Sequence, residues 1–253
     1  MKLVIGEFKE ISKKAAEHIV KLVVQKPDAH LGLATGDTPK VIYENIVNMV
    51  KKNLVSFRHV STYNLDEYAD IDISNPQSYH YYMKKNLFSK IDIIESNTHF
   101  PEINSQKSDS SYYPALENVT IDLQLLGIGA NGHIGFNEPF TPFSSRSHRV
   151  ELSVSTIESN SKFFSEDNPM PQYAFTMGIK DIMKAKEIIL LATGKHKANT
   201  VKQMIEGPVT EKVPASILQL HNNVTIYLDP YAASLLDVRL VQSKEESDEF
   251  HER

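Results

Sequence analysis

A glycine-rich turn that ends in an imidazole is the first feature of the sequence that suggests chemistry. It runs from Gly127 to His133 as Gly-Ile-Gly-Ala-Asn-Gly-His, and the carboxylate of Glu138 follows five residues later. A carboxylate at that spacing can orient an imidazole, the side chain that ordinarily titrates near neutral pH. The pattern predicts a proton-transferring pair, and the alternative is a purely structural histidine.

The same turn contains Gly-x-Gly-x-x-Gly, the spacing of a dinucleotide-binding loop. That function requires a helix directly after the glycines and a ribose-binding carboxylate about 20 residues further on. Residues 134–139 look extended and end in proline, and Glu151 is the main acidic candidate at that distance. We therefore reject a dinucleotide cofactor.

Asp66 and Glu67 are adjacent carboxylates just after a predicted strand, Val60–Tyr63. Side chains of neighbouring residues on an extended backbone leave in opposite directions, so one of the two is expected to face a cleft. A carboxylate in a cleft can act as a general base if burial raises its pKa. The alternative is a solvated pair in a loop.

The run Thr35-Gly36-Asp37-Thr38-Pro39 follows another predicted strand and suggests an anion site. Thr38 can cap a helix that starts at Pro39, and the amide groups of such a turn can hold a phosphate. Asp37 opposes this, because a carboxylate 4 Å from a phosphate charge costs about 4 kcal/mol at an effective dielectric constant near 20. Asp37 must therefore point away if the loop binds phosphate, and an ordinary capped helix is the alternative. Lys195 and Lys197, after a later strand, could supply cations.

Short apolar runs alternate with longer helical patterns over most of the chain. We predict strands at Leu3–Ile5, His30–Ala34, Val60–Tyr63, Ile121–Leu126, Ile188–Ala192 and Val224–Leu228, and helices at 8–25, Pro39–Val50, 77–88 and Lys195–Ile205. This alternation is typical of an α/β fold: a doubly wound, mostly parallel sheet with helices on both faces, in a Rossmann-like three-layer sandwich. The segments singled out above all follow strands, where ligands of such sheets bind.

Composition narrows the possible functions. The 253 residues carry 27 Lys and Arg against 32 Asp and Glu, a formal charge of −5 that argues against nucleic-acid binding. The absence of cysteine excludes disulfides, thiol catalysis and cysteine-ligated zinc, and the dispersed histidines predict no metal site. Apolar runs are too short to cross a membrane, and the N-terminus does not resemble a signal peptide, so we expect a soluble, cytoplasmic protein. We predict a single domain over residues 1–240, followed by a disordered charged tail at 241–253.

Taken together, these motifs resemble the glucosamine-6-phosphate deaminase family in its short, non-allosteric form. The resemblance covers about residues 1–236, and the segment Leu126–Pro139 carries most of it. The other matching segments are Leu33–Pro39, Asn64–Tyr68 and Pro76–Tyr79.

The resemblance implies hydrolytic deamination and isomerisation of glucosamine 6-phosphate to fructose 6-phosphate and ammonia, in amino-sugar breakdown. Asp66 would be the base that moves a proton between C2 and C1, and His133 would open the sugar ring with Asn131 and Glu138 beside it. The implied substrate-binding residues are Thr35, Gly36, Asp37, Thr38, Glu67, Tyr79, Gly132, Lys162 and Lys197. Glu67 would help to poise Asp66, and Tyr79 falls in a segment that resembles a mobile lid. No cofactor is implied, because the substrate's own amine leaves.

Four departures from the family pattern qualify these expectations. Asp37 replaces the usual second glycine of the phosphate loop, and Asn131 stands where the long, regulated members carry Asp. Lys162 replaces the phosphate-contacting Arg of many members, which keeps the charge but loses the bidentate fork. His148 and Val150 stand where regulated members carry Arg and Lys, so we expect no activation by N-acetylglucosamine 6-phosphate. The compact chain favours a monomer over a hexamer.

Two other functions compete with deamination. A sugar-phosphate lactonase resembling 6-phosphogluconolactonase would share the Gly-His turn, but those enzymes generally lack Phe136-Asn137-Glu138-Pro139 and Asn64-Leu65-Asp66-Glu67-Tyr68. A non-catalytic sugar-phosphate sensor would carry a DNA-binding helix-turn-helix ahead of the domain, and the first predicted strand at Leu3 leaves no room for one. Asp37 keeps an inactive sugar-phosphate binder open as an alternative.

Overall fold

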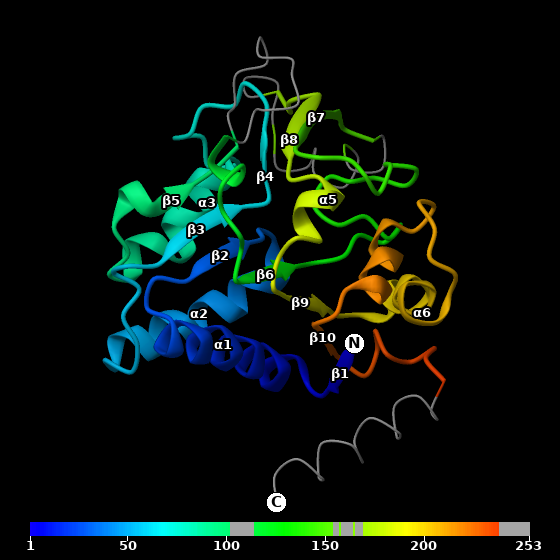
Figure 1. Ribbon diagram of the computed structural model, residues 1–253, viewed down its shortest axis with the longest axis horizontal. Helices are drawn as coiled ribbons and strands as arrows, with labels where there is room; N and C mark the ends of the chain where they lie inside the picture. The colour runs from blue at the N-terminus through cyan, green and yellow to red at the C-terminus, as the bar shows by residue number, and fades with distance from the viewer. Residues whose placement is uncertain (102–113, 154–156, 158–163, 165–168, 238–253) are drawn as a thin grey trace, which may run out of the picture.

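A parallel sheet forms the centre of the protein, seen here in a computed structural model that describes residues 1–101, 114–153, 157, 164 and 169–237. Within these residues the sheet has seven strands, and all of its pairings are parallel (Figure 1). In spatial order the strands are β1 (Lys2–Ile5), β10 (Val224–Leu228), β9 (Glu187–Ala192), β6 (Leu123–Leu126), β2 (His30–Leu33), β3 (Ser61–Asn64) and β5 (Thr98–His99). Because the central strands are buried on both faces, they read in the sequence as short apolar runs.

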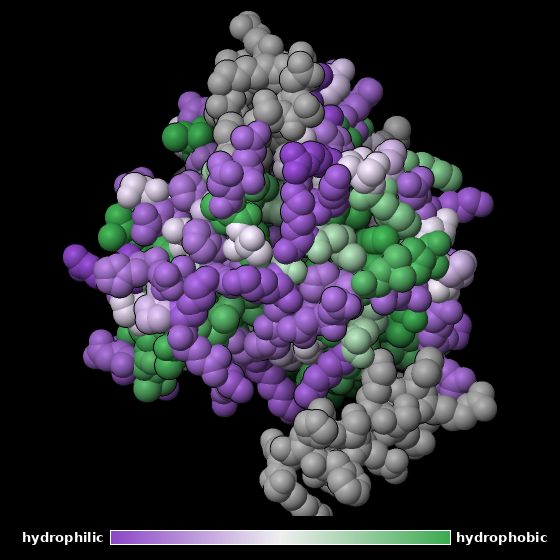
Figure 2. All heavy atoms as spheres, in the orientation of Figure 1, coloured by the Kyte–Doolittle hydropathy of each residue, from purple (hydrophilic) through white to green (hydrophobic). Residues whose placement is uncertain are grey.

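Helices lie on both sides of this sheet, which confirms the predicted α/β class (Figure 1). On one side α1 (Phe8–Gln25) packs along α2 (Asp37–Lys51), and both contact β9. Figure 1 shows α3 (Tyr79–Asn86) and α5 (Ile179–Ile182) on the other side, with α6 (Ala198–Glu206) near β9 and β10. Helix α1 buries Ile11, Ala15, Ile19 and Val23, the three-to-four-residue spacing of an amphipathic helix. The face of the molecule seen in Figure 2 is mostly hydrophilic, with hydrophobic residues in separate groups.

A second, antiparallel sheet was not predicted. It contains β4 (Asp66–Tyr68), β8 (Tyr173–Thr176) and β7 (His148–Glu151) in that order, and Asp66 pairs with Thr176. Tyr68 and Ala174 of this sheet share a small core with residues such as Phe136. The chain passes from the first sheet to the second between β3 and β4, so the adjacent carboxylates lie in a strand and not in a solvated loop.

Most predicted elements are present, with corrections at their ends. Helix α2 begins at Asp37 with Gly36 at the N-cap, so the prediction that Thr38 caps a helix starting at Pro39 was wrong. Ile134 and Asn137 form a bridge across a tight turn, whereas the sequence suggested an extended segment. The first residues of the predicted helix at Lys195 form a short 3-10 helix, η5 (Lys195–Lys197), and α6 follows it. The predicted strand Val224–Leu228 matches β10.

Asp122 joins three segments at the edge where the parallel strands begin. Its buried carboxylate accepts hydrogen bonds from the backbone N–H of His30 (2.8 Å), from Lys26 (2.6 Å) and from Lys186 (2.8 Å). Burial alone would raise the pKa of Asp122, but these donors lower it to about 2. The start of β2 and the approaches to β6 and β9 are therefore fixed to one another.

Three further expectations concern the charged tail, the number of domains and membrane-spanning segments. The tail at 241–253 lies outside the described residues, and a single domain over 1–240 stays a prediction. Across the described ranges, no helix combines the length and apolar character needed to cross a membrane.

Gly32 gives a test of packing in the central sheet. A Cβ atom at this position would lie 1.9 Å from the side-chain oxygen of buried Gln124. We expect Gly32→Ala to lower the free energy of unfolding by about 1–3 kcal/mol, the usual cost of overpacking a core. Gly127→Ala is the matched control, because a Cβ there meets nothing within 4 Å. Equal urea midpoints for the two variants would contradict the prediction.

Candidate active site

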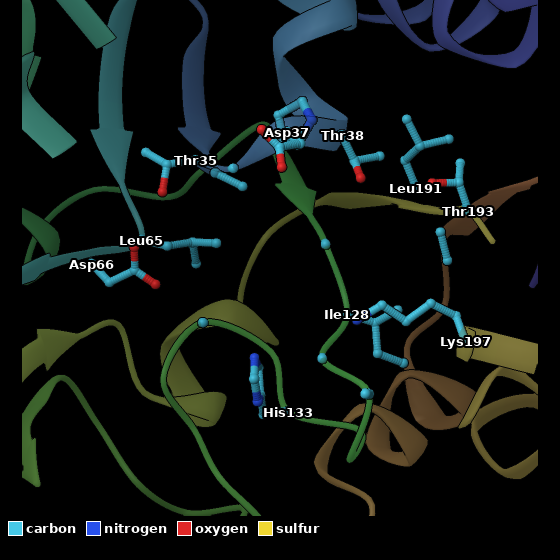
Figure 3. Close-up of a pocket in the computed structure, with 18 of the residues that line it drawn as sticks. Thr35, Asp37, Thr38, Leu65, Asp66, Ile128, His133, Leu191, Thr193 and Lys197 are labelled. Atoms are coloured by element: carbon cyan, nitrogen blue, oxygen red, sulfur yellow. The ribbon is translucent and has the colours of Figure 1, made fainter. Parts of the chain in front are cut away.

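A cavity of about 890 Å³ opens at the edge where the parallel strands end (Figure 3). It lies at the point where the strand order reverses, since the chain adds β3 on one side of β2 and later adds β6 on the other side. Ligands of open α/β sheets bind at this switch point. The segments after β2, β3, β6 and β9 line the cavity, together with Tyr79 of α3.

The cavity brings together nine of the thirteen residues singled out from the sequence: Thr35, Gly36, Asp37, Thr38, Asp66, Tyr79, Asn131, His133 and Lys197. Three others, Glu67, Gly132 and Glu138, are not part of its lining. Lys162 lies outside the described residues. Figure 3 shows Asp66 and His133 on one side of the cavity, and Thr193 and Lys197 on the other.

Asp66 is the buried carboxylate that faces the cavity. Its exposure is 8%, and burial raises the pKa of its carboxyl group to about 8, with the charge of neighbouring Glu67 adding to the rise. A carboxylate that holds its proton this strongly is a better base than an exposed one. The expectation that only one of the two adjacent carboxylates faces the cleft agrees with this geometry.

Glu67 points away from the cavity and is fully buried. Its carboxylate accepts hydrogen bonds from the backbone N–H groups of Tyr68 (2.8 Å), Tyr79 (3.0 Å) and His80 (2.9 Å), and from His80 Nδ1 (2.8 Å). The geometry thus does not support Glu67 as a direct substrate ligand. It places Glu67 beneath the start of α3.

His133, Asn131 and Glu138 form one connected group. Asn131 donates to Glu138 Oε2 (2.6 Å) and accepts from the backbone N–H of His133 (3.2 Å), while Glu138 Oε1 lies 3.4 Å from His133 Nδ1 and accepts from Ser153 (3.1 Å). The Nδ1–Oε1 separation suits an ion pair but does not meet hydrogen-bond geometry. Glycine is required at 129, since a Cβ there would lie 2.3 Å from the imidazole. The ring is therefore held over the glycine turn with a carboxylate behind it.

The opposite side of the cavity is suited to an anion. Helix α2 begins there without a side-chain cap, so the N–H groups of its first turn remain available to a ligand. Lys197 lines the same side, and burial lowers the pKa of its amine. Asp37 is exposed and is also among the residues that line the cavity, so whether its carboxylate repels a phosphate stays a question for experiment.

Sequence reasoning missed two polar residues of this lining, Thr193 and His196. Their position in the sequence could have identified them, because the run Thr193-Gly194-Lys195-His196-Lys197 directly follows β9. From this run, the sequence suggested only the two lysines as ligands. Among the described residues, no group of three or more His, Asp or Glu side chains could hold a metal ion.

Known proteins show the same sequence pattern. The family model described as glucosamine-6-phosphate isomerases/6-phosphogluconolactonase matches residues 8–227. The chain belongs to this family. Within the family, a Clostridium botulinum (strain Kyoto / Type A2) protein named glucosamine-6-phosphate deaminase is 46% identical over 241 residues, which cover 94% of this chain and 99% of that protein.

Solved structures of the glucosamine-6-phosphate isomerase/6-phosphogluconolactonase family have the same fold. A monomeric glucosamine-6-phosphate deaminase superposes with a TM-score of 0.87 at 41% identity, covering 93% of this chain and 100% of the other. A 6-phosphogluconolactonase from Trypanosoma cruzi gives 0.73 at 20% identity, covering 93% and 96%. The lactonase shares the fold, and the deaminases share far more of the sequence.

The raised pKa of Asp66 predicts how stability changes with pH. An aspartate in an unfolded chain titrates near about 3.9, so between that pH and about 8 the folded protein holds one proton more than the unfolded chain. The stabilising contribution is complete at about pH 4 and below, and it is lost as the pH rises to about 8. We expect Asp66→Asn to gain stability relative to the parent protein as pH rises, by at most about 1.4 kcal/mol per unit. Urea unfolding of both proteins at pH 5–8 measures this, and a constant difference would contradict it.

Proposed function

We propose that this protein converts glucosamine 6-phosphate and water into fructose 6-phosphate and ammonia. The observation that carries the proposal is the buried Asp66, which lies on the same side of the cavity as the His133 group, with an anion-suited side opposite them. The 46% identity to proteins named glucosamine-6-phosphate deaminase supports this reaction over lactone hydrolysis.

The substrate phosphate would lie among the first turn of α2, Thr193 and Lys197, which directs the sugar towards the other side of the cavity. There His133 would move a proton from the C1 hydroxyl to the ring oxygen as the bond between C1 and the ring oxygen breaks, while Glu138 at ion-pair distance from Nδ1 would stabilise the imidazolium. Asn131 can hold both groups in place but cannot itself take up a proton.

Asp66 would then remove the proton from C2 of the open-chain sugar as the aldehyde oxygen O1 takes up a proton, giving an enolamine, and return its proton to C1 as the amine loses one. The result is an imine at C2 with a hydroxyl group at C1, and water hydrolyses the imine to the ketone with loss of ammonia. This step needs a base of moderate strength in a site partly closed to water, which suits a carboxyl group with a pKa of about 8. The substrate's own amine is the leaving group, so the scheme requires no cofactor.

We also propose that the protein acts as an unregulated monomer. The structure that shares 41% identity is that of a monomeric deaminase. His148 and Val150 replace the Arg and Lys expected at an activator site, so N-acetylglucosamine 6-phosphate should not change the rate.

Asp66→Asn tests the assigned base. We expect it to lower kcat for release of ammonia and fructose 6-phosphate by about 100-fold or more, because a general base contributes about that much. Binding of glucosamine 6-phosphate, measured by calorimetry, should remain largely intact. Asp92→Asn, an acid bonded to Ser56 away from the cavity, is the control. Turnover by the Asp66 variant within tenfold of the parent would exclude the role, and no product from the parent would exclude the proposed reaction.

Asp37→Gly tests the unfavourable charge on the phosphate side. Removing it should lower KM for glucosamine 6-phosphate by about threefold or more and change kcat less, since the repulsion acts on the bound substrate. Asp37→Asn keeps the shape and removes the charge, so both variants should behave alike. An unchanged or raised KM in steady-state assays would show that Asp37 does not repel the ligand.

A further inference from the structure

The start of helix α3 is attached to the strand that carries Asp66. Three of the four hydrogen bonds that Glu67 accepts come from Tyr79 and His80, the first two residues of α3. A carboxylate at a helix N-terminus is favourable both for the N–H groups and for the helix dipole. Glu67 therefore sets the position of α3 relative to Asp66, its neighbour in sequence.

His80 is the side chain that completes this attachment. Its Nδ1 lies 2.8 Å from Glu67 Oε2, which is ion-pair distance. Its ring is 28% exposed and stacks on Phe100 at 3.6 Å between centroids. A buried carboxylate is costly unless it is paired, so the imidazole supplies an interaction that Glu67 requires.

Helix α3 in turn shapes the cavity. Tyr79 lines the cavity and packs on Phe136, another lining residue, with ring planes 7° apart. One turn later Tyr82 donates a hydrogen bond to the carbonyl oxygen of Gly36, at the start of α2 (2.5 Å). The helix thus connects the Asp66 side of the cavity to its anion side.

We propose that His80 is a positioning residue for the reaction: by bonding to Glu67 it fixes the start of α3, and with it Tyr79, beside Asp66. This inference rests on the proposed deaminase function. His80 does not line the cavity, so it acts through Glu67 and Tyr79 and does not touch the substrate.

The charge of Glu67 also acts on Asp66, its neighbour in sequence. It is the second cause, next to burial, that raises the pKa of Asp66. Tyr79 and His80 of α3 approach Glu67 from one side, and its partner on β8 is the apolar Phe175. Glu67→Gln removes this charge, so we expect the acidic limb of kcat/KM to move to lower pH in that variant.

Two substitutions at this position separate positioning from packing. His80→Phe keeps a ring to stack on Phe100 but removes the bond to Glu67, whereas His80→Asn keeps an N–H donor near the Nδ1 position and removes the ring. We expect His80→Phe to lower kcat by about tenfold or more, because small displacements of positioning groups have effects of that size. KM should change less than about threefold, since the anion side is unaltered. The Asn variant, which keeps the donor to Glu67, should retain kcat within about threefold of the parent.

The matched control is His18→Phe, which breaks another histidine–glutamate pair, His18 with Glu187 (2.9 Å), at the opposite edge of the sheet. It should leave kcat, KM and the pH profile unchanged. A folded His80→Phe protein with the parent's kcat would overturn the proposal, as would equal losses of kcat in the Phe and Asn variants. If His80→Phe does not fold, Glu67→Gln decides, since a folded Glu67→Gln protein with the parent's kcat would show that the attachment of α3 to Glu67 does not position the site, and this would overturn the proposal too. A parent protein that releases no ammonia refutes the proposed function, whereas an active parent with an unaffected His80→Phe variant refutes this inference alone.

Discussion

Two adjacent carboxylates are buried where the chain leaves the parallel sheet and enters the antiparallel one. A buried charge needs hydrogen bonds or a charged partner, and Asp66 and Glu67 meet this requirement differently. Glu67 accepts four hydrogen bonds, mainly from the start of α3, whereas Asp66 faces the cavity and has a pKa raised by burial. The second sheet, the start of α3 and the base of the proposed reaction all meet at these two residues.

The cavity separates two kinds of chemistry. One side has the uncapped start of α2 and Lys197, which suit an anion. The other side holds Asp66 and His133, whose side chains can exchange protons with a ligand. In the proposed reaction, a substrate held by its phosphate would have its reactive end beside Asp66 and His133, so that phosphate binding would also orient the substrate.

The sequence predicted what depends on apolar pattern and on strand ends. The parallel strands and the cluster of Thr35, Asp66, His133 and Lys197 followed from the rule that ligands bind beyond strand ends. The second sheet was missed because β7 (His-Arg-Val-Glu) and β4 (Asp-Glu-Tyr) are rich in charged residues, which are typical of surfaces. The position of Glu67 depends on contacts with α3, a dozen residues away in sequence, and no local pattern contains that information.

The ion pairs of Asp122 have a consequence for how this fold can diverge. They fix β2, β6 and β9 relative to one another at the amino edge of the sheet, far from the cavity. The residues that line the cavity lie at the other edge and take no part in these contacts. A substitution in the cavity therefore leaves the Asp122 contacts in place, and this fold, which a lactonase shares at 20% identity, can carry different sets of cavity residues.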